Sequence, residues 1–314
     1  MLYWDSFFQS GVLEQNGRTI SFSVGTQGAR DIVLLDNREI LSLPVPFNAD
    51  GNLYFPEEFV AALKKNLDKA RQEDATRFRI AAIVVDPGHG GKDNGASGEH
   101  IINGRKVMAV EKEINLAVSL DLYEKLKAGF PDKRILITRT GDSYLELGER
   151  VAKAHALPLK ANEAVIYISI HANASFNKSA RGFEVWYLDP EHKREVIDKA
   201  KFSDQKEIIP ILNDMLAEEY DRESVEMARS IARRFSESFG KELPSRGLKA
   251  EQWFVVRKAR MPSVLVELGF VTNPEDAVLM LSERGLQKFS NSIYNGIMDF
   301  VNNFERSGGF IAFQ

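Results

Sequence analysis

From residue 80 to the C-terminus, short apolar runs of strand length alternate with stretches of helical character. This alternation predicts an α/β fold whose mostly parallel, twisted open sheet has helices on both faces. The clearest helix is the C-terminal one, where apolar residues recur at i, i+3 and i+4 spacing from Leu286 to Phe304, before Gly308-Gly309. The expected strands are 81–85, 134–138, 165–170, 182–188 and 263–267, and the other expected helices are 114–126, 145–156 and 224–239.

The first 70 residues have a different pattern and predict a small β-rich N-terminal domain. Turn-forming pairs separate apolar runs at Asn16-Gly17, Asp36-Asn37 and Asp50-Gly51. A helix is expected to begin at Pro56, because proline and acidic residues favour the first turn. The run 68–79 is charged and lacks apolar periodicity. We therefore expect a domain at 1–70, a linker at 71–79 and a second domain at 80–314.

Composition excludes several classes of protein. A net charge of -4 provides no basic field, which argues against nucleic acid as the partner. The absence of cysteine excludes disulfides, thiolate metal sites and a cysteine nucleophile. No apolar stretch approaches the ~20 residues that cross a bilayer, so no transmembrane segment is expected, and no signal-peptide pattern is visible at the N-terminus.

Two histidines each follow an expected strand. His89 ends the run that closes with Asp86-Pro87-Gly88, and His171 ends the run that closes with Ser169-Ile170. Because chemistry in an open α/β sheet collects at the carboxyl ends of strands, two imidazoles at one edge suggest metal ligands. The glycines Gly88, Gly90 and Gly91 allow tight turns and close backbone approach, which a purely structural histidine does not require.

A third ligand must be a carboxylate, since the chain has no cysteine. Glu111 is our choice because it stands in the first turn of a helix with a wide apolar face, where its backbone would be fixed. Glu113 is the competing candidate, two residues on and therefore roughly on the opposite face.

Glu267 is the fourth residue of interest. It closes the apolar run from Pro262, and a carboxylate there is costly unless it is paired, bound to metal or exposed. One interpretation is that the strand stops there and Glu267 is solvated. The other is that Glu267 is a general base, with a pKa raised by burial or lowered by a cation.

Five sequence blocks together resemble the type-3 family of zinc-dependent N-acetylmuramoyl-L-alanine amidases. They follow one another in the family's order: DPGHGGKD from Asp86, EKEINL from Glu111, SIHAN from Ser169, RGFEV from Arg181 and MPSVLVELGF from Met261. The resemblance covers about residues 80–304. It implies hydrolysis of the amide between the lactyl group of N-acetylmuramic acid and L-alanine of the stem peptide.

The resemblance also implies roles for individual residues and a location. One zinc ion would be held by His89, Glu111 and His171, and Glu267 would be the catalytic carboxylate that takes a proton from a zinc-activated water. Asn173 and Arg181 are expected to contact substrate or orient the site. The partner would be peptidoglycan, in the periplasm or cell wall, so that we expect this sequence to be an exported, processed form.

Two segments depart from the family pattern or suggest regulation. The stretch between Ala96 and Glu111 is longer than usual and contains His100 and Arg105. The charge-dense segment 189–222 is predicted in the first place to be a solvent-exposed helical segment. The alternative is that an activator protein acts on it, with a zinc-covering carboxylate drawn from Glu191, Glu195 or Glu207.

Two other functions stay open beside the amidase. One is another zinc amidohydrolase that acts on a different acylated amine. The other is a catalytically inactive wall-binding protein, against which the intact set of Glu267 and three ligands argues. The N-terminal domain would bind the cell wall or a partner protein, but no motif in residues 1–70 identifies a ligand.

Overall fold

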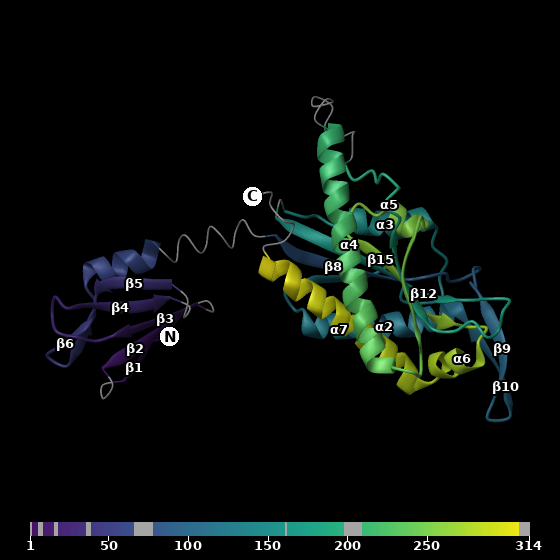
Figure 1. Cartoon of the computed structure of the whole chain (residues 1–314), viewed down its shortest axis with the longest axis horizontal. Coiled ribbons are helices and arrows are strands. Elements are labelled where there is room, and N and C mark those ends of the chain that lie inside the picture. The colour runs from purple at the N-terminus through teal and green to yellow at the C-terminus, as the bar shows by residue number, and fades with distance from the viewer. Residues whose placement is uncertain are drawn as a thin grey trace. The chain divides into compact units, whose positions relative to one another are not determined.

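The computed structural model describes residues 2–5, 9–15, 18–35, 39–65, 78–160, 162–197 and 209–307. Contacts between residues divide the chain into two compact units, Met1–Thr76 and Arg77–Gln314 (Figure 1). Each unit has its own hydrophobic core.

The first unit contains an antiparallel five-stranded sheet in the order β1-β2-β3-β4-β5. Phe22 and Val33 on one face of this sheet pack with Phe59 of a helix that includes residues 57–65, as expected after Pro56. The turn predicted at Asp50-Gly51 is confirmed, since both residues have positive φ between β6 and β7. The strands are β1 (Leu2–Asp5), β2 (Ser10–Gln15), β3 (Arg18–Ser23), β4 (Arg30–Leu35), β5 (Glu39–Pro44), β6 (Phe47–Ala49) and β7 (Asn52–Tyr54).

The other two expected turns join strands that pair as hairpins. Gln15 pairs with Arg18, and Leu35 pairs with Glu39. The turn residues 16–17 and 36–37, like most of the expected linker, lie outside the described residues.

The second unit is built on a six-stranded sheet in the order β11-β8-β12-β15-β13-β14. Neighbouring strands are parallel except for β13 against β15, which confirms a mostly parallel sheet. All five predicted strands are present. The strands are β8 (Arg79–Pro87), β11 (Arg134–Ile137), β12 (Glu163–Asn173), β13 (Phe183–Leu188), β14 (Ser245–Glu251) and β15 (Ser263–Phe270).

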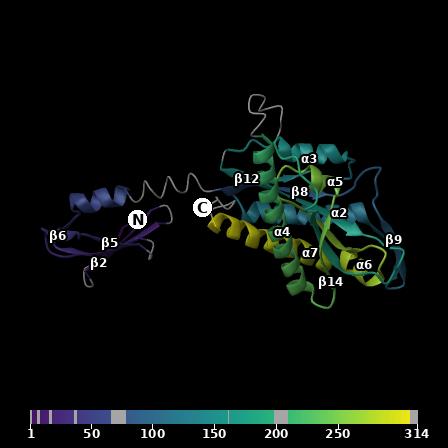
Figure 2. The ribbon, with the colours of Figure 1, turned by 45° about the horizontal axis from the view of Figure 1, so that its top comes forward.

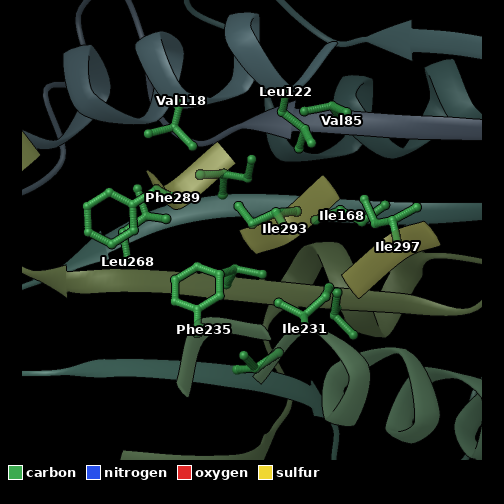
Figure 3. Packing of buried hydrophobic residues seen from close by; sticks show 14 of the residues in the cluster. Val85, Val118, Leu122, Ile168, Ile231, Phe235, Leu268, Phe289, Ile293 and Ile297 are labelled. Carbon is green, nitrogen blue, oxygen red and sulfur yellow. The ribbon is translucent and has the colours of Figure 1, made fainter. Parts of the chain in front are cut away.

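Helices cover both faces of this sheet. On one face the core includes Val118 of α2, Phe235 of α4 and Ile293 of α7, packed on Ile168 of β12 (Figure 3). On the other face Val151 of α3 and Val256 of α5 pack on Val84 of β8. The helices are α2 (Glu111–Gly129), α3 (Leu147–His155), α4 (Ile209–Phe239), α5 (Phe254–Lys258), α6 (Pro274–Leu281) and α7 (Glu283–Ser307). Helices α4 and α7 cross in both views of the ribbon (Figure 1, Figure 2).

Some details differ from the sequence expectation, and strand β14 and helices α5 and α6 were not expected. The stretch before Glu111 forms a hairpin of β9 (Ser97–Ile102) and β10 (Arg105–Val110). Helix α4 begins at Ile209 rather than at 224, and Ala217 on this earlier part is buried. Strand β15 continues past Glu267 to Phe270, because Leu268, Gly269 and Phe270 are themselves buried and Phe270 pairs with Asn173. In the part of the chain that the structure describes, no helix has both the length and the apolar character of a membrane span.

Along β12, the residues on the α3 and α5 face change from apolar to polar. Val165 and Tyr167 pack with α3 and α5, but Ser169, His171 and Asn173 follow on the same face because side chains alternate with period two. The carboxyl end of the sheet therefore presents polar side chains on this face, and the candidate site lies there.

Candidate metal centre

His89, Glu111 and His171 come together in space. One oxygen, Glu111 Oε1, lies 3.0 Å from His89 Nε2 and 3.0 Å from His171 Nδ1. The imidazole rings are 5.0 Å apart between centroids and nearly perpendicular. Within the described residues, these three form the one group of His, Asp and Glu side chains whose ligand atoms are close enough to hold a metal ion.

Two buried arginines fix the backbone that carries His89. Arg150 donates from Nη2 to the His89 carbonyl at 2.6 Å, and Arg139 donates to the Gly88 carbonyl at 2.8 Å. Arg150 is itself paired with buried Asp86 at 2.9 Å. His89 adopts φ of 61°, an uncommon backbone conformation for a residue with a side chain. These contacts therefore hold the imidazole where β8 ends.

Asp93 sets the orientation of the His89 ring. Its Oδ2 atom lies 2.8 Å from His89 Nδ1, and its Oδ1 atom accepts the Gly95 amide at 3.0 Å. A carboxylate on one ring nitrogen fixes the tautomer and leaves the other nitrogen, here Nε2, available as a ligand. No role was expected for Asp93 from the sequence, although a carboxylate four residues after a ligand histidine is a usable signal.

The first residue of α2, Glu111, is buried and held by backbone amides. Its Oε2 accepts the Ala96 amide at 2.8 Å, and its Oε1 accepts the Ala172 amide at 3.1 Å. Glu113 is exposed. The structure therefore places Glu111, and not Glu113, beside the two histidines.

The charges of the three residues support one another. Burial alone would raise the pKa of Glu111, but hydrogen bonds and charge from His171 and His89 outweigh it and hold the pKa well below its usual value. Burial likewise favours neutral His89, but Glu111 and Asp93 outweigh it and raise the His89 pKa. The group formed by His89, Glu111 and His171 therefore contains an ionised carboxylate, which attracts positive charge.

Gly88 provides a test of how tightly His171 is positioned. A Cβ atom at Gly88 would lie 2.3 Å from the His171 ring, closer than carbon atoms can approach. Gly88→Ala is therefore expected to displace the imidazole and weaken metal binding by at least about 10-fold, as for a lost supporting contact. Gly141→Ala is the matched control, because its Cβ would meet nothing within 4 Å. Titration of the metal-free variants with zinc measures the effect, and equal affinity in both variants would contradict the expected displacement.

Glu267 lies next to His171 across the β12–β15 ladder, where the two residues are register partners. Its Oε2 atom is buried, and no described group donates a hydrogen bond to it. Burial, together with the negative charges of Glu111 and Glu184, raises the pKa of Glu267 well above its ordinary value. A carboxyl group with one oxygen buried and without a donor is suited to holding a proton or facing a cation.

Glu184 is a site residue whose role sequence reasoning missed. It is buried opposite Glu267 in the β13–β15 pair. It accepts hydrogen bonds from Asn173 Nδ2 at 3.1 Å and Trp186 Nε1 at 3.1 Å, and from Arg246 Nε at 2.6 Å. Glu184 stands between Phe183 and Val185 in an apolar strand, just as Glu267 does in its own strand. This pattern could have drawn attention to Glu184.

The remaining expected residues lie in different surroundings. Asn173 is at the end of β12, two residues beyond His171 on the same face, and is hydrogen-bonded to Glu184. Arg181 contacts Glu275 and Asp276 of α6 instead, and it also donates to the Glu242 carbonyl. A substrate contact by Arg181 stays a prediction.

The described part of segment 189–222 is tied to α4 and to the chain before β15. Buried Arg194 donates to the Met261 carbonyl at 2.6 Å, and the Val196 amide donates to Asn213 at 2.8 Å. Glu191 and Glu195 are exposed and do not belong to the metal-binding group. Glu207 lies outside the described residues.

The longer stretch before Glu111 leads directly into the site. The β9–β10 hairpin begins next to Ala96, whose amide bonds Glu111, and ends at Val110. His100 within it is buried, and its Nε2 lies 2.7 Å from the Val271 carbonyl.

A sequence profile of the N-acetylmuramoyl-L-alanine amidase family matches residues 83–299. The chain belongs to this family. The matched region of the amidase contains His89, Glu111, His171 and Glu267, and it leaves the first unit outside.

Individual relatives and solved structures agree with this assignment. The amidase is 33% identical over 215 residues to the uncharacterised protein YqiI of Bacillus subtilis, covering 68% of this chain and 82% of YqiI. It is 29% identical over 238 residues to the N-acetylmuramoyl-L-alanine amidase AmiA of Escherichia coli, covering 71% and 77%. The catalytic domain of CwlV, an amidase from Bacillus (Paenibacillus) polymyxa, has 28% identity and a TM-score of 0.53, covering 71% of this chain and 99% of CwlV.

Proposed function

We propose that this chain is a peptidoglycan hydrolase that cleaves the amide between the lactyl group of N-acetylmuramic acid and L-alanine of the stem peptide. The observation that carries the proposal is the shared oxygen of Glu111, 3.0 Å from both His89 and His171, with Glu267 on the adjacent strand. Membership of the amidase family supports the same reaction.

The residues fit a single zinc ion. Two imidazoles and one carboxylate are a donor set of catalytic zinc sites, which leave a fourth position open. Glu267 stands beside His171 on the adjacent strand, with its Oε2 atom buried and without a hydrogen-bond donor among the described residues. When bound, zinc would polarise the scissile carbonyl, make the attacking water more acidic and lower the raised pKa of Glu267.

The chain's own groups then handle the proton. Glu267 would take a proton from the attacking water, whose oxygen bonds to the carbonyl carbon. It would then pass the proton to the amide nitrogen as the carbon–nitrogen bond breaks. Asp93 keeps the His89 ring in one orientation during these steps, and the amides of Ala96 and Ala172 hold the Glu111 carboxylate in place.

Digestion of purified sacculi tests this reaction. We expect peptides with a newly freed L-alanine amino group and glycan strands with unsubstituted lactyl carboxylates, both identified by mass. Chelation should stop the release and zinc should restore it, since the hydrolytic water depends on the cation. Release of glycan fragments with intact peptides, or no release at all, would contradict the assignment. Cleavage of other acylated amines in place of this amide would favour the alternative zinc amidohydrolase.

The proposal extends to location, domains and partners. We propose that the protein acts in the periplasm or cell wall, that residues 80–314 carry the catalysis and that residues 1–70 form a separate module joined by a linker at 71–79. A protein that acts on segment 189–222 stays a prediction. The apolar side chains of Leu212, Met215 and Leu216, which line a pocket of about 670 Å³, are the surface to which we expect such a protein to bind.

A further inference from the structure

Arg246 lies on the polar face of the sheet, beyond the residues that the reaction uses. Phe183 pairs with Ser245 but Val185 pairs with Leu248, so that Arg246 and Gly247 both stand opposite Glu184 in a β-bulge. Gly247 has φ of 87°, which glycine adopts without strain. Bulges re-aim side chains beside active sites. Here the bulge brings the Arg246 guanidinium to Glu184, which lies opposite Glu267.

Only one of the three guanidinium nitrogens of Arg246 donates a hydrogen bond to a described residue. Its Nε atom donates to Glu184 at 2.6 Å, and its Cζ atom lies 5.0 Å from the centroid of the Phe270 ring. Its two terminal nitrogens have no partner among the described residues, and 38% of the side chain is exposed. An arginine held at Nε and by an aromatic ring keeps its other donors in a fixed plane, which suits a carboxylate.

The surroundings of Arg246 are basic and aromatic. Lys249 lies 3.7 Å from Glu184 and 5.6 Å from the Trp186 ring centroid. Trp253 stands edge-on to Trp186, with ring centroids 5.8 Å apart, and is 44% exposed. Among the described residues, both cations pair with one acid, Glu184, so the group retains positive charge at its surface.

We infer that Arg246 is a specificity-determining residue that binds a free carboxylate of the stem peptide, with Lys249 and the exposed Trp253 beside it. This inference rests on the proposed amidase function. On the glycan side of the scissile bond, the only carboxyl group is the lactyl one, which is tied up in the amide itself. The peptide side carries free carboxylates, and the cationic group therefore marks the peptide side of the site.

The distances suit a short peptide. His171, Glu267 and Glu184 stand on three neighbouring strands, β12, β15 and β13, and strands are about 4.8 Å apart. The guanidinium at Glu184 is therefore roughly 10 Å from the histidine strand. An extended peptide spans about 3.4 Å per residue, so a carboxylate within roughly three residues of the scissile bond would reach Arg246.

Two soluble N-acetylmuramoyl peptides test the inference, one with free peptide carboxylates and one with all of them amidated. The wild type should cleave the free form with a kcat/KM at least about 10-fold higher, because a hydrogen bond to a charged group is worth about this factor or more. Arg246→Gln should lose this preference, and Arg246→Lys should keep part of it. Arg229→Gln is the matched control, because Arg229 is an exposed arginine of α4 paired with Glu226.

Each outcome bears on the inference. Loss of the preference in Arg246→Gln, with Arg229→Gln unchanged, would support it. Equal cleavage of the two peptides by the wild type would overturn it while leaving the amidase function intact. The inference would also be overturned if Arg246→Gln lowered kcat/KM for both peptides by the same factor. That result is expected if Arg246 only holds Glu184 in position. Cleavage of neither peptide by the wild type would overturn the proposed function and this inference together.

Binding of the peptide product gives a second readout. Calorimetry with the free tripeptide should show weaker binding to Arg246→Gln than to the wild type by about 10-fold or more, and equal, weak binding of the amidated tripeptide to both. Equal affinity of the two proteins for the free tripeptide would overturn the inference.

Discussion

Glu267→Gln is expected to lower kcat by about 10²–10⁴-fold while the zinc content stays at the wild-type level. Glutamine has nearly the same shape but cannot take a proton from water. Because no described group donates to Glu267 Oε2, the substitution breaks no hydrogen bond at that atom. It also removes a buried acid whose pKa is raised by burial and by Glu111 and Glu184, so the fold should not suffer.

Measuring kcat and zinc in the same preparation separates catalysis from metal binding. Full turnover by Glu267→Gln would reject the general-base role. Loss of zinc together with loss of turnover would mean that Glu267 acts as a ligand rather than as a base.

His171→Ala is expected to abolish both zinc binding and turnover. The imidazole is one of three ligands, and even supporting contacts around a metal are worth 10–100-fold in affinity, so the loss should be at least about 100-fold. Removal of the ring also leaves Glu111 Oε1 without one of its two histidine partners. Turnover should fall with the zinc, since the reaction needs the cation.

Glu113→Gln is the matched control for the ligand set. Glu113 is two residues from Glu111 on the same helix but exposed, so its variant should keep zinc and activity. Zinc loss in Glu113→Gln with retention in Glu111→Gln would reverse the assignment made from the helix geometry.

Much of the catalytic fold could be predicted because buried parallel strands are recognisable in a sequence as continuous apolar runs. Strand β8 is buried from Ile80 to Pro87, and β12 is equally apolar before His171. The amphipathic face of α7 was equally clear. Strand β14, with the sequence SRGLKAE, was missed because an edge strand is mostly exposed and needs no apolar run. The β9–β10 hairpin is likewise exposed along much of its length, including the apolar residues Ile101 and Met108.

The candidate site could be predicted in part. Two strand-end histidines and a first-turn glutamate converge because parallel strands end at one edge and α2 begins there. Glu267 was expected at a strand end but lies within β15, since the apolar run goes on to Phe270. Asp93, four residues after His89, is a local signal that was left unused. The pairing of Glu184 with Arg246 could not be predicted, because it joins two strands that are distant in sequence and depends on tertiary distances that no local pattern encodes.

The most direct test of the account is to count zinc per chain in three proteins purified side by side: the wild type, Glu267→Gln and His171→Ala. If His89, Glu111 and His171 hold the metal and Glu267 only moves the proton, the first two should bind one zinc per chain and the third essentially none. Equal zinc in all three, or none in the wild type after zinc is supplied, would contradict the shared metal centre on which the proposed hydrolysis depends.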